Sequence, residues 1–179
     1  MRVENGPGMT APPPPVTTSR WLGPLLFAVI LIADLVSKEW ALATLRGLGR
    51  VEITGFFNLV LVWNPGISFG MFQTDSELGR WLLIALALAI ATILVFWLRW
   101  EQRLTPKLAI WLILAGALGN VIDRIRHGAV VDFLDFHVFG YHWPAFNVAD
   151  SAIVVGAVIL VVDSLFGERR ALTPERKEK

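Results

Sequence analysis

Four long apolar segments alternate with polar connections along this chain and predict membrane-spanning helices. The segment 81–98 is the clearest, because no charged residue lies between Arg80 and Arg99. A helix of that length rises about 27 Å, close to the hydrocarbon thickness of about 30 Å. The other three segments carry acidic residues inside them or at their ends. We predict four transmembrane helices, over residues 21–45, 81–98, 108–125 and 146–166.

Two of the connections have a β-prone pattern instead. Val51–Thr54 and Leu59–Val62 flank Gly55 in the first connection, and residues 130–138 alternate between apolar and polar in the last one. Both connections leave the helices on the same side of the membrane. We therefore predict a small β-sheet platform lying on the membrane, in a fold that is otherwise mainly α-helical.

The composition agrees with an integral membrane protein. Hydrophobic residues make up 55% of the 179 residues and charged residues only 17%, which favours a membrane protein over a soluble domain. The chain has no cysteine, which excludes disulfides, thiolate catalysis and thiolate metal sites. Residues 1–20 contain the run Pro12–Pro15 and few apolar side chains, so we expect a flexible tail.

Basic residues predict the orientation in the membrane. Ten of the 16 Lys and Arg residues lie in the two terminal tails and the 99–107 connection. The positive-inside rule therefore places both termini in the cytoplasm. The alternative for the first segment is a cleavable secretion signal, but Asp34, Lys38 and Glu39 interrupt it, so we expect a retained helix. The expected division is a cytoplasmic tail 1–20, a membrane domain 21–166 and a cytoplasmic tail 167–179.

Acidic residues in three of the segments fall at a similar depth. Counted from the cytoplasmic ends, Asp34 lies about 21 Å up the first helix, and Asp123 and Asp150 lie about 24 Å up the third and fourth. Asp132 lies in the outer connection before the fourth helix. A carboxylate in so apolar a setting is costly, so it marks a functional site by default. We expect this connection to fold back and bring Asp132 next to Asp150.

A close pair of aspartates has a specific chemistry. Neighbouring carboxylates resist double ionisation, so one keeps a proton while the other is ionised. The ionised member can take a proton from water while the protonated member polarises an amide carbonyl, which hydrolyses a peptide without a metal. We expect no Gly-x-Ser-x-Gly nucleophile elbow, no His-Glu-x-x-His zinc motif and no Gly-x-x-x-x-Gly-Lys phosphate-binding loop. The alternative for Asp132 is a salt bridge with Arg124 or Arg126.

Five sequence blocks surround these aspartates in a fixed order. They are Asp34-Leu35-Val36-Ser37-Lys38, Asn64-Pro65-Gly66-Ile67-Ser68-Phe69-Gly70, Gly119-Asn120-Val121-Ile122-Asp123-Arg124, Gly128-Ala129-Val130-Val131-Asp132-Phe133 and Phe146-Asn147-Val148-Ala149-Asp150. Together they closely resemble the lipoprotein signal peptidase family, also called signal peptidase II. The resemblance spans roughly Trp21 to Phe166, nearly all of the chain apart from its tails.

This resemblance implies an aspartic endopeptidase of the bacterial inner membrane, with its sheet and active site near the periplasmic face. It would remove the signal peptide from prolipoproteins whose cysteine carries diacylglycerol, cutting just before that cysteine. Asp132 and Asp150 would form the catalytic dyad. The resemblance also implies inhibition by globomycin. We expect a monomer that contacts membrane lipid, needs no cofactor or metal and binds no nucleic acid.

Other residues of the five blocks are expected to shape the site and to bind the substrate backbone. Asn64 precedes a turn at Gly66 that could present its amide to a substrate. Asn120 and Asp123 are three apart on one helical face and can point inward together. Arg124 follows them, and a helix-end ion pair between Asp123 and Arg124 is a compatible alternative to substrate positioning.

Two further expectations concern support of the dyad. Asp34 and Lys38 are four apart on a helix, so we expect them to pair with each other as structural support. Asn147 lies in the first turn of the fourth helix, where it can orient Asp150 or cap the helix.

The sequence allows two alternative functions, a metallohydrolase and a transporter. A metallohydrolase could use a cluster of two or more ligands in the last connection, although the spacing fits no recognised pattern. The residues concerned are His127, Asp135, His137 and His142. A small transporter could use the intramembrane acids to relay protons, but four short helices without a repeat make a poor pathway.

Overall fold

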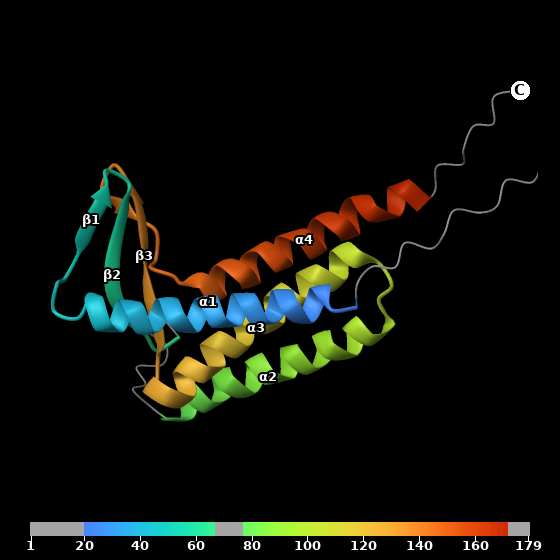
Figure 1. Ribbon diagram of the computed structural model, residues 1–179, viewed down its shortest axis with the longest axis horizontal. Helices are drawn as coiled ribbons and strands as arrows, with labels where there is room; N and C mark the ends of the chain where they lie inside the picture. The colour runs from blue at the N-terminus through green and yellow to red at the C-terminus, as the bar shows by residue number, and fades with distance from the viewer. Residues whose placement is uncertain (1–19, 67–76, 172–179) are drawn as a thin grey trace, which may run out of the picture.

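The computed structural model describes residues 20–66 and 77–171 (Figure 1). The Pro-rich tail up to residue 19, the segment 67–76 and residues 172–179 lie outside the described residues. The expectations for residues 1–19 and 172–179 of the two tails, and for the block residues Ile67 to Gly70, therefore have no structural counterpart here, whereas residues 167–171 of the expected C-terminal tail belong to the last helix.

Four helices form a bundle in which α3 contacts each of the other three (Figure 1). Their positions confirm the four predicted helical segments. Among the described residues, three helices are long and apolar enough to cross a membrane, namely α2, α3 and α4 up to Phe166. The first helix is not among these, because it contains Asp34, Lys38 and Glu39. The helices are α1 (Leu22–Thr44), α2 (Glu77–Trp100), α3 (Leu104–His127) and α4 (Val148–Ala171).

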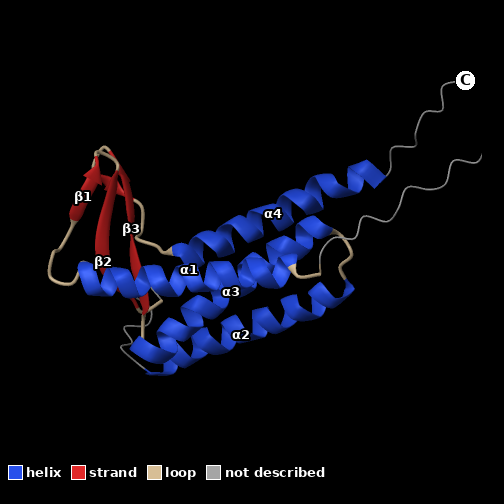
Figure 2. Cartoon of the chain, in the orientation of Figure 1, coloured by secondary structure: helices blue, strands red, loops and turns tan. Residues whose placement is uncertain are grey.

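A four-stranded antiparallel sheet of order β1-β2-β3-β4 covers one end of the bundle, and its strands run across the helix axes (Figure 2). The strands are β1 (Val51–Thr54), β2 (Phe57–Asn64), β3 (Val130–Val138) and β4 (Tyr141–His142). The three predicted strands are confirmed, and β4 is an addition. In the pairing of β2 with β3, Val62 lies opposite Asp132.

The sheet is joined to the bundle through the end of α3. Gly128 has a left-handed backbone with φ of 81°, and its N–H donates to the Arg124 carbonyl at 3.1 Å. Glycine adopts this conformation without steric cost, which makes it the usual residue just after a helix. The chain leaves α3 there and enters β3 two residues later, so Asp132 follows the end of α3 closely.

Glycines allow α3 and α4 to approach each other closely. A β-carbon on Gly116 would collide with the Ala149 carbonyl oxygen, and one on Gly119 would collide with the Asp34 carboxylate. A β-carbon on Gly156 would lie 2.6 Å from the Ala109 carbonyl oxygen. The contact between the two helices therefore fixes where the first turn of α4, with Asp150, lies.

Gly116→Ala is expected to destabilise the protein by about 1–3 kcal/mol, because the added methyl group must push the α4 backbone away. Unfolding in detergent micelles, followed by circular dichroism, measures this. Gly55→Ala is the matched control, because nothing lies within 4 Å of its β-carbon position, and it should stay within about 0.5 kcal/mol of wild type. Equal stability of the two variants would contradict this account of the helix contact.

Candidate active site

Asp132 and Asp150 come from two elements that the backbone ties together. Asp132 lies on β3 and is 1% exposed, and Asp150 lies in the first turn of α4. Phe146, two residues before α4, closes the gap: its carbonyl accepts from the N–H groups of Phe133 and Leu134 at 3.1 and 2.9 Å, and its own N–H donates to the Leu134 carbonyl at 3.1 Å. The predicted fold-back of the last connection is thus present.

Asn147 connects the two aspartates directly. Its Nδ2 donates to Asp132 Oδ1 at 2.7 Å. Its Oδ1 accepts from the Asp150 N–H at 2.9 Å, and its own N–H donates to Asp150 Oδ2 at 3.3 Å. This reciprocal pattern caps the start of α4 as a capping box does. Asn147 is fully buried, so one side chain both caps the helix and fixes the two carboxylates relative to each other.

Two more amides complete the hydrogen bonding of the pair. Asn64 Nδ2 donates to Asp132 Oδ2 at 2.9 Å, while its Oδ1 accepts from the Gly66 N–H at 2.9 Å. Asn120 Nδ2 donates to Asp150 Oδ1 at 2.8 Å. Both oxygens of Asp132 therefore face amide donors at short distance, whereas Asp150 Oδ2 has only the longer bond from the Asn147 backbone.

The surroundings of Asp132 raise the pKa of its carboxyl group. Burial, together with the negative charge of Asp150, raises the pKa of Asp132 from 3.8 to about 6, against the opposing hydrogen bonds of Asn64 and Asn147 and the charge of Lys38. Carboxyl groups with raised pKa values are typical of acid–base sites, because they exchange a proton near neutral pH.

A buried ionic cluster lies beneath the pair. Lys38 Nζ lies 2.8 Å from Asp34 Oδ2 and 3.0 Å from Asp123 Oδ2, and it donates to Asn120 Oδ1 at 3.1 Å. Lys38, Asp34 and Asp123 are all at most 2% exposed. The expected pair of Asp34 with Lys38 is present, and Lys38 also neutralises Asp123.

Each acid of this cluster holds the residue just before a dyad aspartate. Asp123 Oδ2 accepts from the Val131 N–H at 3.0 Å, and Asp34 Oδ1 accepts from the Ala149 N–H at 2.8 Å. Because Val131 precedes Asp132 and Ala149 precedes Asp150, the cluster fixes the backbone of β3 and α4 relative to α1 and α3. Charge-assisted bonds of this kind are short and strong.

Arg124 and Arg126 do not make the salt bridges with Asp132 or Asp123 that the sequence left as alternatives. Arg126 pairs with Glu39 at 2.7 Å. Among the described residues, neither Asp132 nor Asp123 forms a salt bridge with an arginine, so the helix-end ion pair of Asp123 with Arg124 is wrong: its partner is Lys38. Arg124 donates to the Asn120 carbonyl at 3.3 Å, and within the described chain its buried Nε has no partner.

The guanidinium of Arg124 lies beside the turn that holds Asn64. A β-carbon on Gly66 would lie 3.3 Å from Arg124 Nη2. Gly66 itself has φ of 105°, a conformation that side chains rarely adopt. Glycine is therefore needed for the turn, and a β-carbon there would collide with Leu83 and crowd the guanidinium of Arg124.

The rival metal ligands do not assemble into a site. Across residues 20–66 and 77–171, no group of three or more His, Asp or Glu side chains is arranged to hold a metal ion. Asp135 instead accepts from Asn58 at 2.8 Å and lies 2.8 Å from His142 Nδ1. Burial opposes ionisation of Asp135, but these two hydrogen bonds outweigh it and lower its pKa. Asn58, which is 2% exposed, was not predicted.

The sequence also contains a serine motif. The run Gly66-Ile67-Ser68-Phe69-Gly70 has the spacing of a nucleophile elbow, so the expectation that no such motif occurs is wrong as a statement about the sequence. A nucleophile elbow follows a strand, leads into a helix and works with a histidine. Residues 67–70 lie outside the described residues, so Ser68 is tested by substitution below.

The fold and the site define a helical membrane protein with a bridged carboxylate pair beneath a small sheet. A family model described as signal peptidase (SPase) II matches residues 26–166. The lipoprotein signal peptidases of Burkholderia ambifaria (strain MC40-6) and Burkholderia vietnamiensis (strain G4) are 50% and 48% identical to this chain over 147 residues. The match covers 81% of this chain and 87% of each relative. The chain belongs to the signal peptidase II family.

Solved structures agree with this assignment. A bacterial membrane enzyme determined by the in meso method at 2.3 Å resolution matches with a TM-score of 0.73 and 29% identity, over 88% of this chain and 94% of the other. A second such structure, at 1.9 Å resolution, matches with a TM-score of 0.72 and 31% identity, over 80% of this chain and 92% of the other. The fold is thus that of known bacterial membrane enzymes.

Proposed function

We propose that this protein is a membrane aspartic endopeptidase that removes signal peptides from diacylglyceryl-modified prolipoproteins, cutting before the lipidated cysteine. The observation that carries the proposal is the bridge of Asn147 between Asp132 and Asp150 at the sheet-covered end of an apolar bundle. The names of the relatives supply the substrate class. The same names do not support the transporter alternative.

Hydrogen bonding supports different roles for the two aspartates. Asp132 accepts amide donors on both oxygens, an arrangement that suits the ionised form. Asp150 Oδ2 has the weakest donor of the four oxygens, and it is the oxygen best placed to carry the shared proton. In the singly protonated pair, we therefore assign Asp132 as the general base and Asp150 as the general acid.

The reaction follows from these roles. Asp132 takes a proton from a water molecule as the water oxygen attacks the scissile carbonyl carbon. Asp150 gives its proton to the carbonyl oxygen, which forms a neutral tetrahedral diol. The carbon–nitrogen bond then breaks as Asp132 returns its proton to the leaving nitrogen and Asp150 regains one from the diol hydroxyl. Arg124, whose Nε has no partner in the described parts of the chain, is placed to bind a backbone carbonyl of the substrate.

The proposed arrangement in the membrane uses all four helices. On α1 the charged Asp34 and Lys38 are buried against the other helices, so they do not face lipid. The opposite side of α1 shows an exposed apolar row at helical spacing, Leu25, Val29, Ile32 and Val36, each more than half exposed. This row supports α1 as a fourth transmembrane helix, although α1 also carries the charged residues Asp34, Lys38 and Glu39.

The remaining assignments follow from this arrangement and the charge distribution. We place the protein in the bacterial inner membrane, with both termini and the tails 1–20 and 167–179 in the cytoplasm. The domain 21–166 then carries the sheet and the dyad at the periplasmic face. An extended substrate would add to the sheet as a strand, with its lipid chains between helices. We also propose that the enzyme acts as a monomer and binds globomycin.

Cleavage by the purified protein tests the proposed function. In phospholipid nanodiscs it should cut a diacylglyceryl prolipoprotein just before the modified cysteine, as mass spectrometry of the product would show, and leave the unmodified precursor intact. EDTA should not change the rate. Cleavage lost in EDTA and restored by zinc would overturn the aspartic mechanism, and no cleavage of the diacylated precursor would overturn the function.

The pH dependence of cleavage should reflect Asp132. Because the two aspartates must hold one proton between them, and Asp132 beside an ionised Asp150 has its pKa raised to about 6, we expect kcat/KM to fall about tenfold per pH unit above an apparent pKa near 6. Measurement from pH 4.5 to about 8 with a fluorescent lipopeptide gives this limb, and a flat profile would contradict the assignment. The raised pKa also means that this group stabilises the fold most below about pH 4 and stops doing so above about pH 6.

A further inference from the structure

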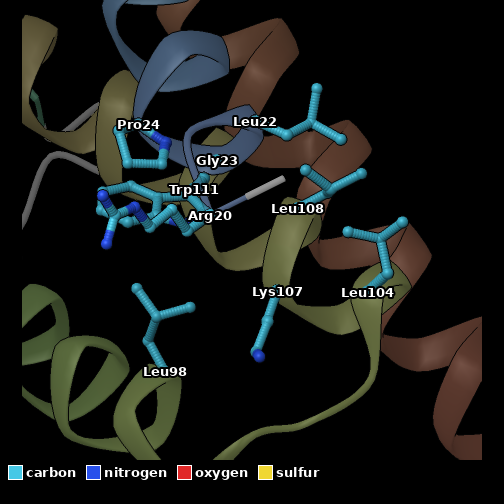
Figure 3. Close-up of a pocket in the computed structure, with 9 residues that line it drawn as sticks. All are labelled: Arg20, Leu22, Gly23, Pro24, Leu98, Leu104, Lys107, Leu108 and Trp111. Atoms are coloured by element: carbon cyan, nitrogen blue, oxygen red, sulfur yellow. The ribbon is translucent and has the colours of Figure 1, made fainter. Parts of the chain in front are cut away.

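A cavity of about 290 Å³ opens at the end of the bundle that lies away from the sheet (Figure 3). It is bounded by the start of α1, the end of α2 and the start of α3. Its walls include Leu98, Leu108 and Trp111, and two basic residues, Arg20 and Lys107, also line it. Asp132 and Asp150, at the other end of the bundle, do not line this cavity.

One wall of the cavity is held in place by close packing. The indole of Trp111 lies so close to Gly23 that a β-carbon there would overlap it. The same indole packs edge-on against Phe27, with ring centroids 5.8 Å apart. Because Trp111 is fixed on two sides, the space beside it is a feature of the packing rather than of one loose side chain.

The charges around the cavity are not balanced. Among the residues that the structure describes, no carboxylate lines the cavity, and neither Arg20 nor Lys107 forms an ion pair. The neighbouring acids are engaged elsewhere, since Glu101 and Asp163 both pair with Arg103. The guanidinium of Arg20 lies 5.3 Å from the centre of the Trp21 ring, and this contact does not neutralise its positive charge. The cavity therefore combines two cations with apolar walls.

We infer that this cavity binds the headgroup phosphate of an anionic phospholipid of the cytoplasmic leaflet, with the acyl chains along the apolar helices. The phosphate would lie between Arg20 and Lys107. Basic pockets between membrane helices on the cytoplasmic side are suited to such headgroups. The leaflet rests on the orientation given under the proposed function, but the site does not depend on the catalytic chemistry.

Lipid retention tests this inference without any cleavage assay. Native mass spectrometry of the protein released from nanodiscs of phosphatidylglycerol and phosphatidylcholine should find retained phosphatidylglycerol. The Arg20→Gln/Lys107→Gln variant should retain roughly 30-fold less, given about one kcal/mol for each basic residue at a membrane surface. Arg99→Gln is the matched control, because Arg99 lies at the same end of α2 but outside the cavity, and it should retain lipid as wild type does.

A second variant separates a built site from a generally basic surface. Leu108→Trp keeps both cations but fills part of the cavity, and it should also lose retained phosphatidylglycerol. Circular dichroism in micelles establishes that each variant is folded. Equal retention of the two lipids by wild type, or undiminished retention in both cavity variants, would overturn the inference. Displacement of the lipid by millimolar inorganic phosphate would also overturn it, in favour of a site for free phosphate.

Discussion

Asp132→Asn and Asp150→Asn are each expected to reduce prolipoprotein cleavage on the order of 10³-fold, because each removes one half of the proton transfer that activates water and polarises the carbonyl. Asparagine keeps the size of the side chain, so Asn147 can still lie between the two positions. Initial rates with a diacylated prolipoprotein, measured on protein purified in micelles, give the result. Cleavage at the normal rate in either variant would refute the dyad.

Two control variants sharpen this prediction. Asp135→Asn changes a buried acid on the same strand that is bonded to Asn58 and His142 instead of the dyad, and it should keep most of the activity. Ser68→Ala removes the hydroxyl of the GxSxG run and should also keep it. A loss in Ser68→Ala as large as that in Asp132→Asn would indicate a serine nucleophile and contradict the aspartic mechanism.

Lys38→Met is expected to destabilise the protein by about 3–5 kcal/mol, because it leaves two buried carboxylates without their shared cation. Asp34 is fully buried and Asp123 is 2% exposed, so hydration cannot stabilise the charge of either carboxylate. Equilibrium unfolding in mixed micelles measures the loss. Cleavage should fall as well, since these acids hold the backbone N–H groups just before Asp132 and Asp150.

The matched control for Lys38 is a basic residue in an exposed pair. Arg126 binds Glu39 at 2.7 Å, but the two side chains are 49% and 52% exposed, so Arg126→Met should cost less than about 1 kcal/mol. The triple change Lys38→Met, Asp34→Asn and Asp123→Asn removes all three charges and should recover most of the stability. A Lys38→Met protein as stable as wild type would show that the cluster does not support the fold.

Local sequence patterns predicted most of the secondary structure of this protein correctly. A helix places residues three and four apart on one face, and this rule gave the pair of Asp34 with Lys38 and the common face of Asn120 and Asp123. Strand alternation gave residues 130–138 as a strand. The cost of a charge in an apolar segment then singled out the acids of the site. The family resemblance, in turn, supplied the dyad roles and the substrate class.

The contacts that assemble the site depend on pairs far apart in the chain. Lys38 and Asn120 are 82 positions apart, and Asp34 and Ala149 are 115 positions apart. Spacing within one helix cannot give such contacts, because they depend on how each helix is rotated and how closely it approaches its neighbours. The sequence therefore allowed Arg124 as the partner of Asp123, although the structure shows Lys38 in that place. It also left open whether Asn147 caps the helix or orients Asp150, and in the structure Asn147 does both.

The sequence by itself determined that the chain forms apolar helices and a small sheet, and that its acids fall near one end of them, because periodicity and the cost of burial act locally. Only the tertiary structure decided that one lysine serves two acids and that one asparagine joins the dyad. The reason is steric: glycines at positions 116 and 119 let α3 approach α4 and α1 closely, and that approach brings the buried polar groups within hydrogen-bonding distance.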